Sequence, residues 1–187
     1  MAGEIVVTIP VPSLIVLIGA AGAGKTSLAA RLFDPDEVIS SDELRAVISG
    51  DAADQRATRP AFAILHRELG SRLGAGRLVV VDATSVEERA RRALLRGSKA
   101  AHVVATALVL ALPGDLVHVR NEARQDRPVP AEVVDRHLAR VADLVARGDA
   151  AAVETLRGEG FSTVAILRSD DEIARLRIVR VPAVSPP

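Results

Sequence analysis

The chain has 187 residues, of which 49% are hydrophobic and 26% are charged, a composition typical of one globular domain. Its 24 basic and 24 acidic residues balance, so any affinity for a polyanion must come from a local patch. The absence of cysteine excludes a disulfide framework and thiolate metal sites. No apolar run reaches transmembrane length and the N-terminus shows no signal-peptide pattern, so we expect a cytoplasmic protein.

Apolar runs alternate with helical patterns along the whole chain. The apolar runs predict five strands, at residues 14–18, 38–40, 78–81, 102–110 and 162–167. Helical spacing predicts helices between and after them, at residues 27–32, 42–48, 58–73, 86–95, 113–124, 131–147 and 149–157. Asp149 is expected to cap one helix, and Ser169 with Glu172 predicts the start of a last one. This alternation predicts an α/β fold of the P-loop NTPase type, a parallel sheet with helices on both faces.

The proline-rich end, residues 181–187, is typical of a linker. We therefore expect one domain over residues 1–180, followed by a connection to a further module of a longer protein.

The segment GAAGAGKT at residues 19–26 fits the phosphate-binding pattern G-x-x-x-x-G-K-[ST] between a predicted strand and a predicted helix. Its glycines let backbone N–H groups turn toward phosphate oxygens, and the helix N-terminus adds positive charge. Lys25 can reach the β- and γ-phosphates, and the Thr26 hydroxyl can bind Mg²⁺. The residues expected to bind the nucleoside triphosphate are Gly22, Ala23, Gly24, Lys25, Thr26 and Ser27.

The segment SSDELR at residues 40–45 follows the second predicted strand, at the edge where open α/β sheets bind ligands. Asp42 and Arg45 are three residues apart, so they share a helix face. Asp42 could accept the proton of an attacking hydroxyl, and Arg45 could orient that group or hold a phosphate of the acceptor. Ser40 and Glu43 have capping-box spacing, so the segment also fits a simple helix start. The pattern alone leaves both interpretations open.

The strand at residues 78–81 is followed by Asp82. In phosphate-loop proteins an aspartate at this place commonly serves Mg²⁺, directly or through water. The alternative is a turn residue, but the phosphate loop favours the metal role.

A further segment, RNEARQDR at residues 120–127, carries three arginines. Arg120 and Arg124 are four apart and share a helix face, and Arg127 follows before a proline. Planar guanidinium groups suit the charge on a transferring phosphoryl group, which predicts a lid over the donor phosphates. The competing interpretation is a solvated basic helix end, because the chain has 22 arginines against two lysines.

With these segments together, the chain resembles the 5′-kinase domain of bacterial polynucleotide kinase-phosphatases and, more distantly, the phage polynucleotide kinases. The similarity extends from about residue 14 to about residue 172. The segments that carry it are VLIGAAGAGKT (16–26), EVISSDELR (37–45), DQRAT (54–58), VVDAT (80–84), Arg91, RNEARQDR (120–127) and RGEGF (157–161). One departure is Ser85, where many relatives have asparagine.

The resemblance implies a role for each candidate residue. Lys25 and Thr26 would hold the triphosphate and Mg²⁺, and Asp82 would serve the metal. Asp42 would be the general base for a 5′-hydroxyl, and Arg45 would contact the acceptor's 3′-phosphate. The lid on the donor phosphates would consist of Arg120, Arg124 and Arg127. Family members carry phosphatase and ligase modules after the kinase and act in RNA end repair.

We therefore predict an ATP-dependent polynucleotide 5′-hydroxyl kinase that acts on RNA or DNA ends. With three Phe and neither Tyr nor Trp, few rings are available for base stacking, so phosphate and apolar contacts should dominate acceptor binding. Two other functions fit the same loop: a small-molecule kinase, and a regulatory module that binds an NTP and hydrolyses it slowly.

Overall fold

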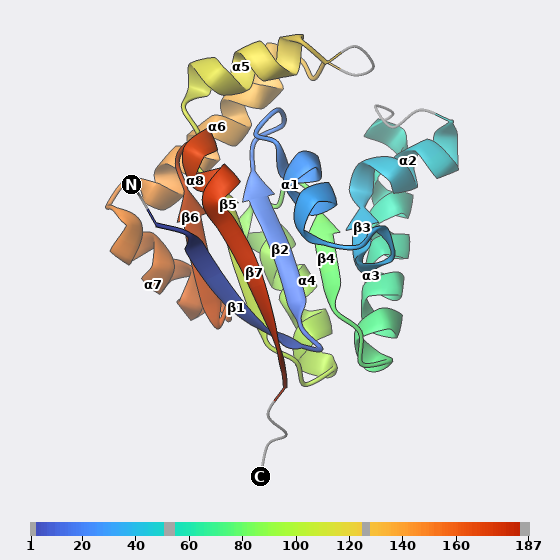
Figure 1. Ribbon diagram of the computed structural model, residues 1–187. Coiled ribbons are helices and arrows are strands. Elements are labelled where there is room, and N and C mark those ends of the chain that lie inside the picture. The colour runs from blue at the N-terminus through green and yellow to red at the C-terminus, as the bar shows by residue number, and fades with distance from the viewer. Residues whose placement is uncertain (1–2, 51–54, 125–127, 184–187) are drawn as a thin grey trace.

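The computed structural model describes residues 3–50, 55–124 and 128–183 (Figure 1). Its main sheet is parallel and has five strands in the order β3-β4-β2-β5-β6, which confirms the predicted α/β fold. These strands are β2 (Leu14–Gly19), β3 (Val38–Ser40), β4 (Val79–Asp82), β5 (Ala105–Leu110) and β6 (Thr163–Leu167).

The sheet is covered on both faces, which explains why its strands are continuous apolar runs. Every residue of β2, β4 and β5 is buried. Because strand side chains alternate between faces, Ile15 and Leu17 enter one core cluster, whereas Val16 and Ile18 enter the other. The core is thus two apolar layers separated by one sheet.

Each predicted helix is present with shifted ends. The helices are α1 (Lys25–Leu32), α2 (Ser41–Ser49), α3 (Thr58–Gly74), α4 (Glu88–Ala100), α5 (Gly114–Glu122), α6 (Ala131–Val145), α7 (Asp149–Glu159) and α8 (Asp170–Arg175). Two short 3₁₀ turns, η1 (Pro35–Glu37) and η2 (Gln55–Ala57), precede β3 and α3. Within the described ranges, no helix is long and apolar enough to cross a membrane.

The predicted cap of α7 was wrong. Gly148 occupies the cap position with φ of +91°, which glycine adopts without a Cβ penalty. Asp149 is the first helical residue, and its carboxylate accepts a hydrogen bond from Arg168 Nε at 3.1 Å. The cap of α8 was right, because the Ser169 hydroxyl accepts from the Glu172 amide at 3.2 Å.

A second sheet, which the sequence analysis did not predict, joins the two ends of the chain. Its strands β1 (Ile5–Val11) and β7 (Leu176–Pro182) are parallel and lie in front of the main sheet beside α1 (Figure 1). Ile9 and Leu176 are fully buried, so this ribbon covers part of one sheet face in place of a helix.

The segment expected to be a linker, residues 181–187, overlaps the last strand. Val181 and Pro182 belong to β7, and the Ala183 amide donates to the Val11 carbonyl at 3.1 Å. Proline lacks the N–H that would donate a hydrogen bond to the neighbouring strand. At the end of a strand the loss of this one hydrogen bond is compatible with pairing. Residues 184–187 of that segment lie outside the described residues.

A buried ion pair fixes the loop after β4. Arg91 donates to both carboxylate oxygens of Glu159, at 2.7 and 2.6 Å, and the two side chains are 5% and 3% exposed. Arg91 also donates to the carbonyls of Ser85 and Val86, at 3.2 and 2.7 Å. Ser85 has φ of +49°, a conformation that asparagine tolerates better than most residues with a side chain.

We predict that Glu159→Ala lowers the free energy of unfolding by about 3–5 kcal/mol, because it leaves the Arg91 charge buried and unpaired. Glu88→Ala is the matched control, since it removes the partner of Arg92 in an exposed pair of 2.6 Å. That change should cost less than about 1 kcal/mol. Urea denaturation of both variants measures the difference, and equal losses would contradict the structural role of the buried pair.

Candidate active site

The phosphate loop leaves β2 at the centre of the sheet and enters α1. Gly22 and Gly24 have φ of +87° and +89°, which a residue with a Cβ rarely adopts. A Cβ on Gly22 would lie 2.7 Å from the Val117 carbonyl oxygen, so α5 packs directly on the loop. Gly24 is the N-terminal cap of α1, where free N–H groups and the helix dipole favour an anion.

Lys25 lies in this loop with only 8% of its surface exposed. Its Nζ donates to the carbonyls of Gly19 and Ala20, at 3.0 and 2.9 Å. Burial lowers the pKa of Lys25, and the carboxylates of Asp82 and Asp42 act in the opposite direction. A bound triphosphate would add negative charge beside the amine and favour its protonated form.

Thr26 and Asp82 come together as the sequence predicted. The Thr26 hydroxyl donates to Asp82 Oδ2 at 2.6 Å, and Asp82 is buried. Mg²⁺ prefers oxygen ligands and is usually bound by one or two protein groups together with substrate phosphates and water. The hydroxyl and the carboxylate therefore fit a Mg²⁺ ion carried with a triphosphate.

At the start of α2 the structure shows the helix cap that the spacing of Ser40 and Glu43 predicted, and the catalytic role of Asp42 and Arg45 stays a prediction. The Ser40 hydroxyl accepts from the Glu43 amide at 3.3 Å, so Ser40 caps the helix. Asp42 and Arg45 are not needed for this cap and form an ion pair with each other. Both side chains line the same cavity as the phosphate loop.

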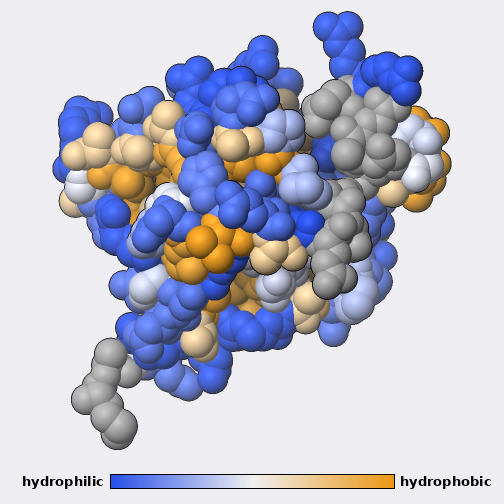
Figure 2. Space-filling model, turned by 90° about the horizontal axis from the view of Figure 1, so that it is seen from above, coloured by the Kyte–Doolittle hydropathy of each residue, from blue (hydrophilic) through white to orange (hydrophobic). Residues whose placement is uncertain are grey.

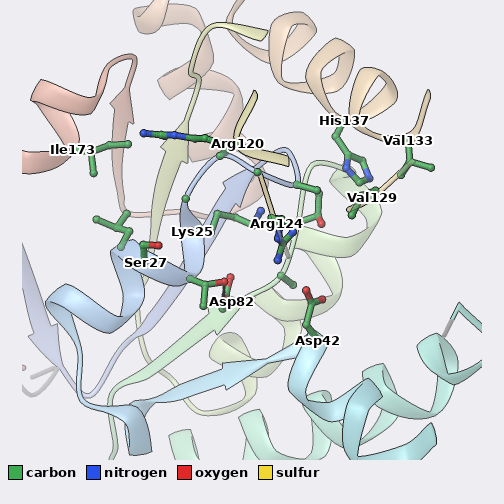
Figure 3. A pocket seen from close by; sticks show the side chains of 18 of the residues that line it. Lys25, Ser27, Asp42, Asp82, Arg120, Arg124, Val129, Val133, His137 and Ile173 are labelled. Atoms are coloured by element: carbon green, nitrogen blue, oxygen red, sulfur yellow. Dashed lines mark hydrogen bonds between the residues drawn. The ribbon is translucent and has the colours of Figure 1, made fainter. Parts of the chain in front are cut away.

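This cavity has a volume of about 630 Å³ and lies over the carboxyl ends of the strands. Figure 2 looks down on this edge of the molecule, where hydrophilic side chains dominate and apolar ones are confined to patches. In Figure 3, Lys25 and Asp82 lie on one side of the cavity, Asp42 below and His137 above. A donor phosphate on the loop and an acceptor beside Asp42 would share one space.

The arginine segment is only partly placed as predicted. Arg124 lines the cavity and its charge lowers the pKa of Lys25, although burial is the larger cause. Arg120 also lines it, but its guanidinium donates to both carboxylate oxygens of Asp170, each at 2.7 Å. Arg127 lies outside the described residues. The catalytic role of these arginines stays a prediction.

Asn121, near the start of the arginine segment, is bound to Val129 just after its end. The sequence analysis did not single out this residue. The side-chain amide donates to the Val129 carbonyl at 2.7 Å and accepts from the Val129 amide at 3.1 Å. Asn121 is 3% exposed, and its Cβ faces Gly22. The arginine segment is thereby tied to the phosphate loop.

His137 is a second cavity residue that spacing alone did not reveal. Val129, Val133 and His137 are four residues apart in turn, and all three line the cavity from above. Burial, followed by the charge of Lys25, lowers the pKa of His137, so its neutral form predominates at neutral pH. The four-residue spacing of these side chains was visible in the sequence. The sequence did not show that they face the phosphate loop and the ends of the strands.

The family of AAA domains matches residues 14–145 of the chain. The chain belongs to this family. The match includes the phosphate loop, Asp42, Asp82 and the arginine segment, so the site lies within the AAA domain. No curated protein matches the sequence.

Solved structures with similar folds share little sequence with this AAA domain. A chain of the Pnkp1/Rnl/Hen1 RNA repair complex is 13% identical, with a TM-score of 0.63, over 91% of this chain and 80% of that one. Kti12 of Chaetomium thermophilum, in complex with ADP-AlF3, is 20% identical, with a TM-score of 0.62, over 87% and 92%. A gluconokinase from Sinorhizobium meliloti 1021 is 19% identical, with a TM-score of 0.52, over 88% and 87%. These likenesses show the fold.

We predict that Gly22→Ala weakens the binding of Mg·ATP by on the order of tenfold or more, because the new Cβ displaces α5 from the loop. Gly148→Ala is the matched control, since its φ of +91° resembles the +87° of Gly22 but nothing lies within 4 Å of its Cβ. The control should lose about 1–2 kcal/mol of stability and keep its nucleotide affinity. Titration with a fluorescent ATP analogue measures both affinities, and equal weakening would contradict the packing argument.

Proposed function

We propose that this protein is a kinase that transfers the γ-phosphate of ATP, or of another NTP, to the 5′-hydroxyl end of RNA or DNA. The observation that carries the proposal is the placement of Asp42 and Arg45 in the cavity of the phosphate loop. A module that only binds nucleotide needs no carboxylate and guanidinium facing the γ-phosphate position, whereas a kinase needs a base and an acceptor site there.

The donor side of the proposed reaction uses the loop. Backbone N–H groups of the loop and of the first turn of α1 hold the phosphates, and Lys25 neutralises charge that grows on the donor. Thr26 and Asp82 would hold Mg²⁺, which supplies further neutralisation of the β- and γ-phosphates when bound. Arg124 lies beside Lys25 and adds a planar donor for the transferring group.

The acceptor side uses the start of α2. Asp42 accepts the proton of the attacking hydroxyl, which makes its oxygen a better nucleophile for the γ-phosphate. Arg45 orients the Asp42 carboxylate through their ion pair. In this proposal the same guanidinium contacts the phosphate that follows the first nucleoside of the acceptor.

The polynucleotide acceptor is supported by the resemblance of seven segments to polynucleotide 5′-kinases and by the fold shared with a chain of an RNA repair complex. The fused phosphatase and ligase modules and a cytoplasmic location belong to the same proposal.

A small-molecule acceptor is the second candidate. Its support is the fold shared with a gluconokinase, with similar coverage of both chains. Arg45 is paired with the Asp42 carboxylate. Because this pair carries no net charge, a neutral or weakly charged acceptor also suits the site.

The test of the proposal is transfer of labelled γ-phosphate from ATP to a 5′-hydroxyl oligonucleotide. A 5′-phosphorylated oligonucleotide, gluconate and water serve as alternative acceptors in parallel reactions. We expect label only on the 5′-hydroxyl oligonucleotide and none with Lys25→Ala. Label on gluconate alone would establish the small-molecule kinase, and release of phosphate to water alone would establish a hydrolysing module.

We predict that Asp42→Asn slows the transfer step by on the order of 10²–10⁴-fold, because the amide cannot accept the hydroxyl proton. Nucleotide affinity should change little, since Asp42 faces the acceptor. Single-turnover transfer and nucleotide titration measure the two quantities. If Asp42→Asn keeps its rate and only unfolds more easily, the residue is structural.

We also predict that Arg124→Ala lowers kcat by on the order of 10²-fold or more, because a donor aimed at charge that develops during transfer is lost. Arg124→Lys should restore little, since an ammonium lacks the planar fork. Arg147→Ala, which changes an exposed arginine in the turn after α6, is the matched control. Steady-state kinetics at varied ATP concentration measures kcat and KM for each variant. An effect confined to KM would contradict the prediction, because Arg124 would then only help to bind ATP before the transfer step.

A further inference from the structure

A second cavity, of about 470 Å³, adjoins the first on the acceptor side. Three residues line both cavities, namely Arg45, Thr84 and His137. The second cavity lies between α2, α3, the loop after β4 and α6. An acceptor that extends past its reacting hydroxyl has room to continue there.

The lining of this cavity combines apolar surface with cations. The apolar part comes from Phe62, Val86, Ala90 and Ala139. The cationic part comes from Arg45, Arg136 and Arg140, and the acidic residues Glu87 and Asp143 are also present. Apolar surface beside guanidinium groups suits a nucleotide, which carries a flat base and a phosphate.

Phe62 offers a ring to the cavity. It is one of three phenylalanines, lies on α3 and is only half-buried, although it packs on the core. The other ring nearby is that of His66, 6.3 Å away between centroids. Base–aromatic stacking tolerates any base, so Phe62 provides a sequence-independent contact.

The two arginines of α6 are available to a phosphate. Among the described residues, Arg136 makes no hydrogen bond or ion pair that the structure records, and it is exposed. Arg140 pairs with Glu87 at 3.1 Å, but these side chains are 56% and 45% exposed. An exposed pair of this kind is weak, so a phosphate can compete for Arg140.

His137 adds a neutral hydrogen-bonding group where the cavities meet. Its Nδ1 is buried and has no hydrogen-bond partner among the described residues. A buried polar atom without a partner is costly, which favours a role toward a ligand. A neutral imidazole can donate to one sugar or phosphate oxygen or accept from a hydroxyl.

We infer that the second cavity binds the second nucleotide of a single-stranded acceptor, with its base against Phe62 and its 3′-phosphate between Arg136 and Arg140. The inference rests on the proposed polynucleotide function. Arg45, shared by both cavities, holds the phosphate between the first and second nucleotides. The cavity is also lined by the acidic residues Glu87 and Asp143, whose negative charge would repel a further phosphate.

The experiment compares three acceptors: a 5′-hydroxyl nucleoside 3′-phosphate, the dinucleotide with a 3′-phosphate, and that dinucleotide with an abasic second position. We expect kcat/KM to rise on the order of tenfold from the mononucleotide to the dinucleotide, with part of the rise lost in the abasic acceptor. Phe62→Leu keeps an apolar side chain for folding and removes the ring. For each dinucleotide we take the ratio of its kcat/KM to that of the mononucleotide. Phe62→Leu should lower this ratio for the full dinucleotide and not for the abasic one.

Arg140→Ala should lower the ratio for both dinucleotides, because the phosphate is present in each. Arg92→Ala, an exposed arginine on α4 that is also paired with a glutamate, should keep the wild-type ratio. A wild-type ratio near one, or ratios unchanged in Phe62→Leu and Arg140→Ala, would overturn the second-nucleotide site while leaving the kinase intact. Failure to phosphorylate any of the three acceptors would instead overturn the polynucleotide function, and the site with it.

Discussion

The parallel pairing of three neighbouring strands determines where the chemistry of this protein lies. β2 pairs with β4, and β4 pairs with β3 so that Ser40 stands opposite Asp82. Because parallel strands end at the same edge, this register brings the phosphate loop, Asp82 and the start of α2 together. The 2.6 Å hydrogen bond between Thr26 and Asp82 depends on it directly. A shift of β4 by one residue would turn Asp82 toward the other face.

Above this edge lie α5 and α6 (Figure 1), and both helices contribute residues to the lining of the cavity. The contact of Gly22 with α5 and the double hydrogen bond of Asn121 to Val129 fix their position on the loop. Arg120 donates to Asp170, whereas Arg124 lies near enough to Lys25 for their charges to interact. In the proposed lid, Arg124 would act from its present place, and Arg120 would exchange its carboxylate partner for phosphate.

Local patterns were enough to predict the main sheet, because buried parallel strands are continuous apolar runs and the phosphate loop has fixed spacing. Lys25, Thr26, Asp42 and Asp82 could be proposed for the same reason: each lies at or after the carboxyl end of a strand. The β1–β7 ribbon was missed because its strands come from opposite ends of the chain, and no local pattern shows that two such distant segments pair. His137 and Asn121 were missed because their roles depend on which strand ends α5 and α6 cover, and no local spacing encodes that.

The most direct test of the account is a crystal structure with a non-hydrolysable ATP analogue, Mg²⁺ and a 5′-hydroxyl dinucleotide. The account predicts the triphosphate on the loop, the Thr26 hydroxyl beside Mg²⁺ and the acceptor's 5′-oxygen within hydrogen-bonding reach of the Asp42 carboxylate, in line with the γ-phosphate. An acceptor bound elsewhere, with Asp42 turned away from its 5′-oxygen, would contradict it.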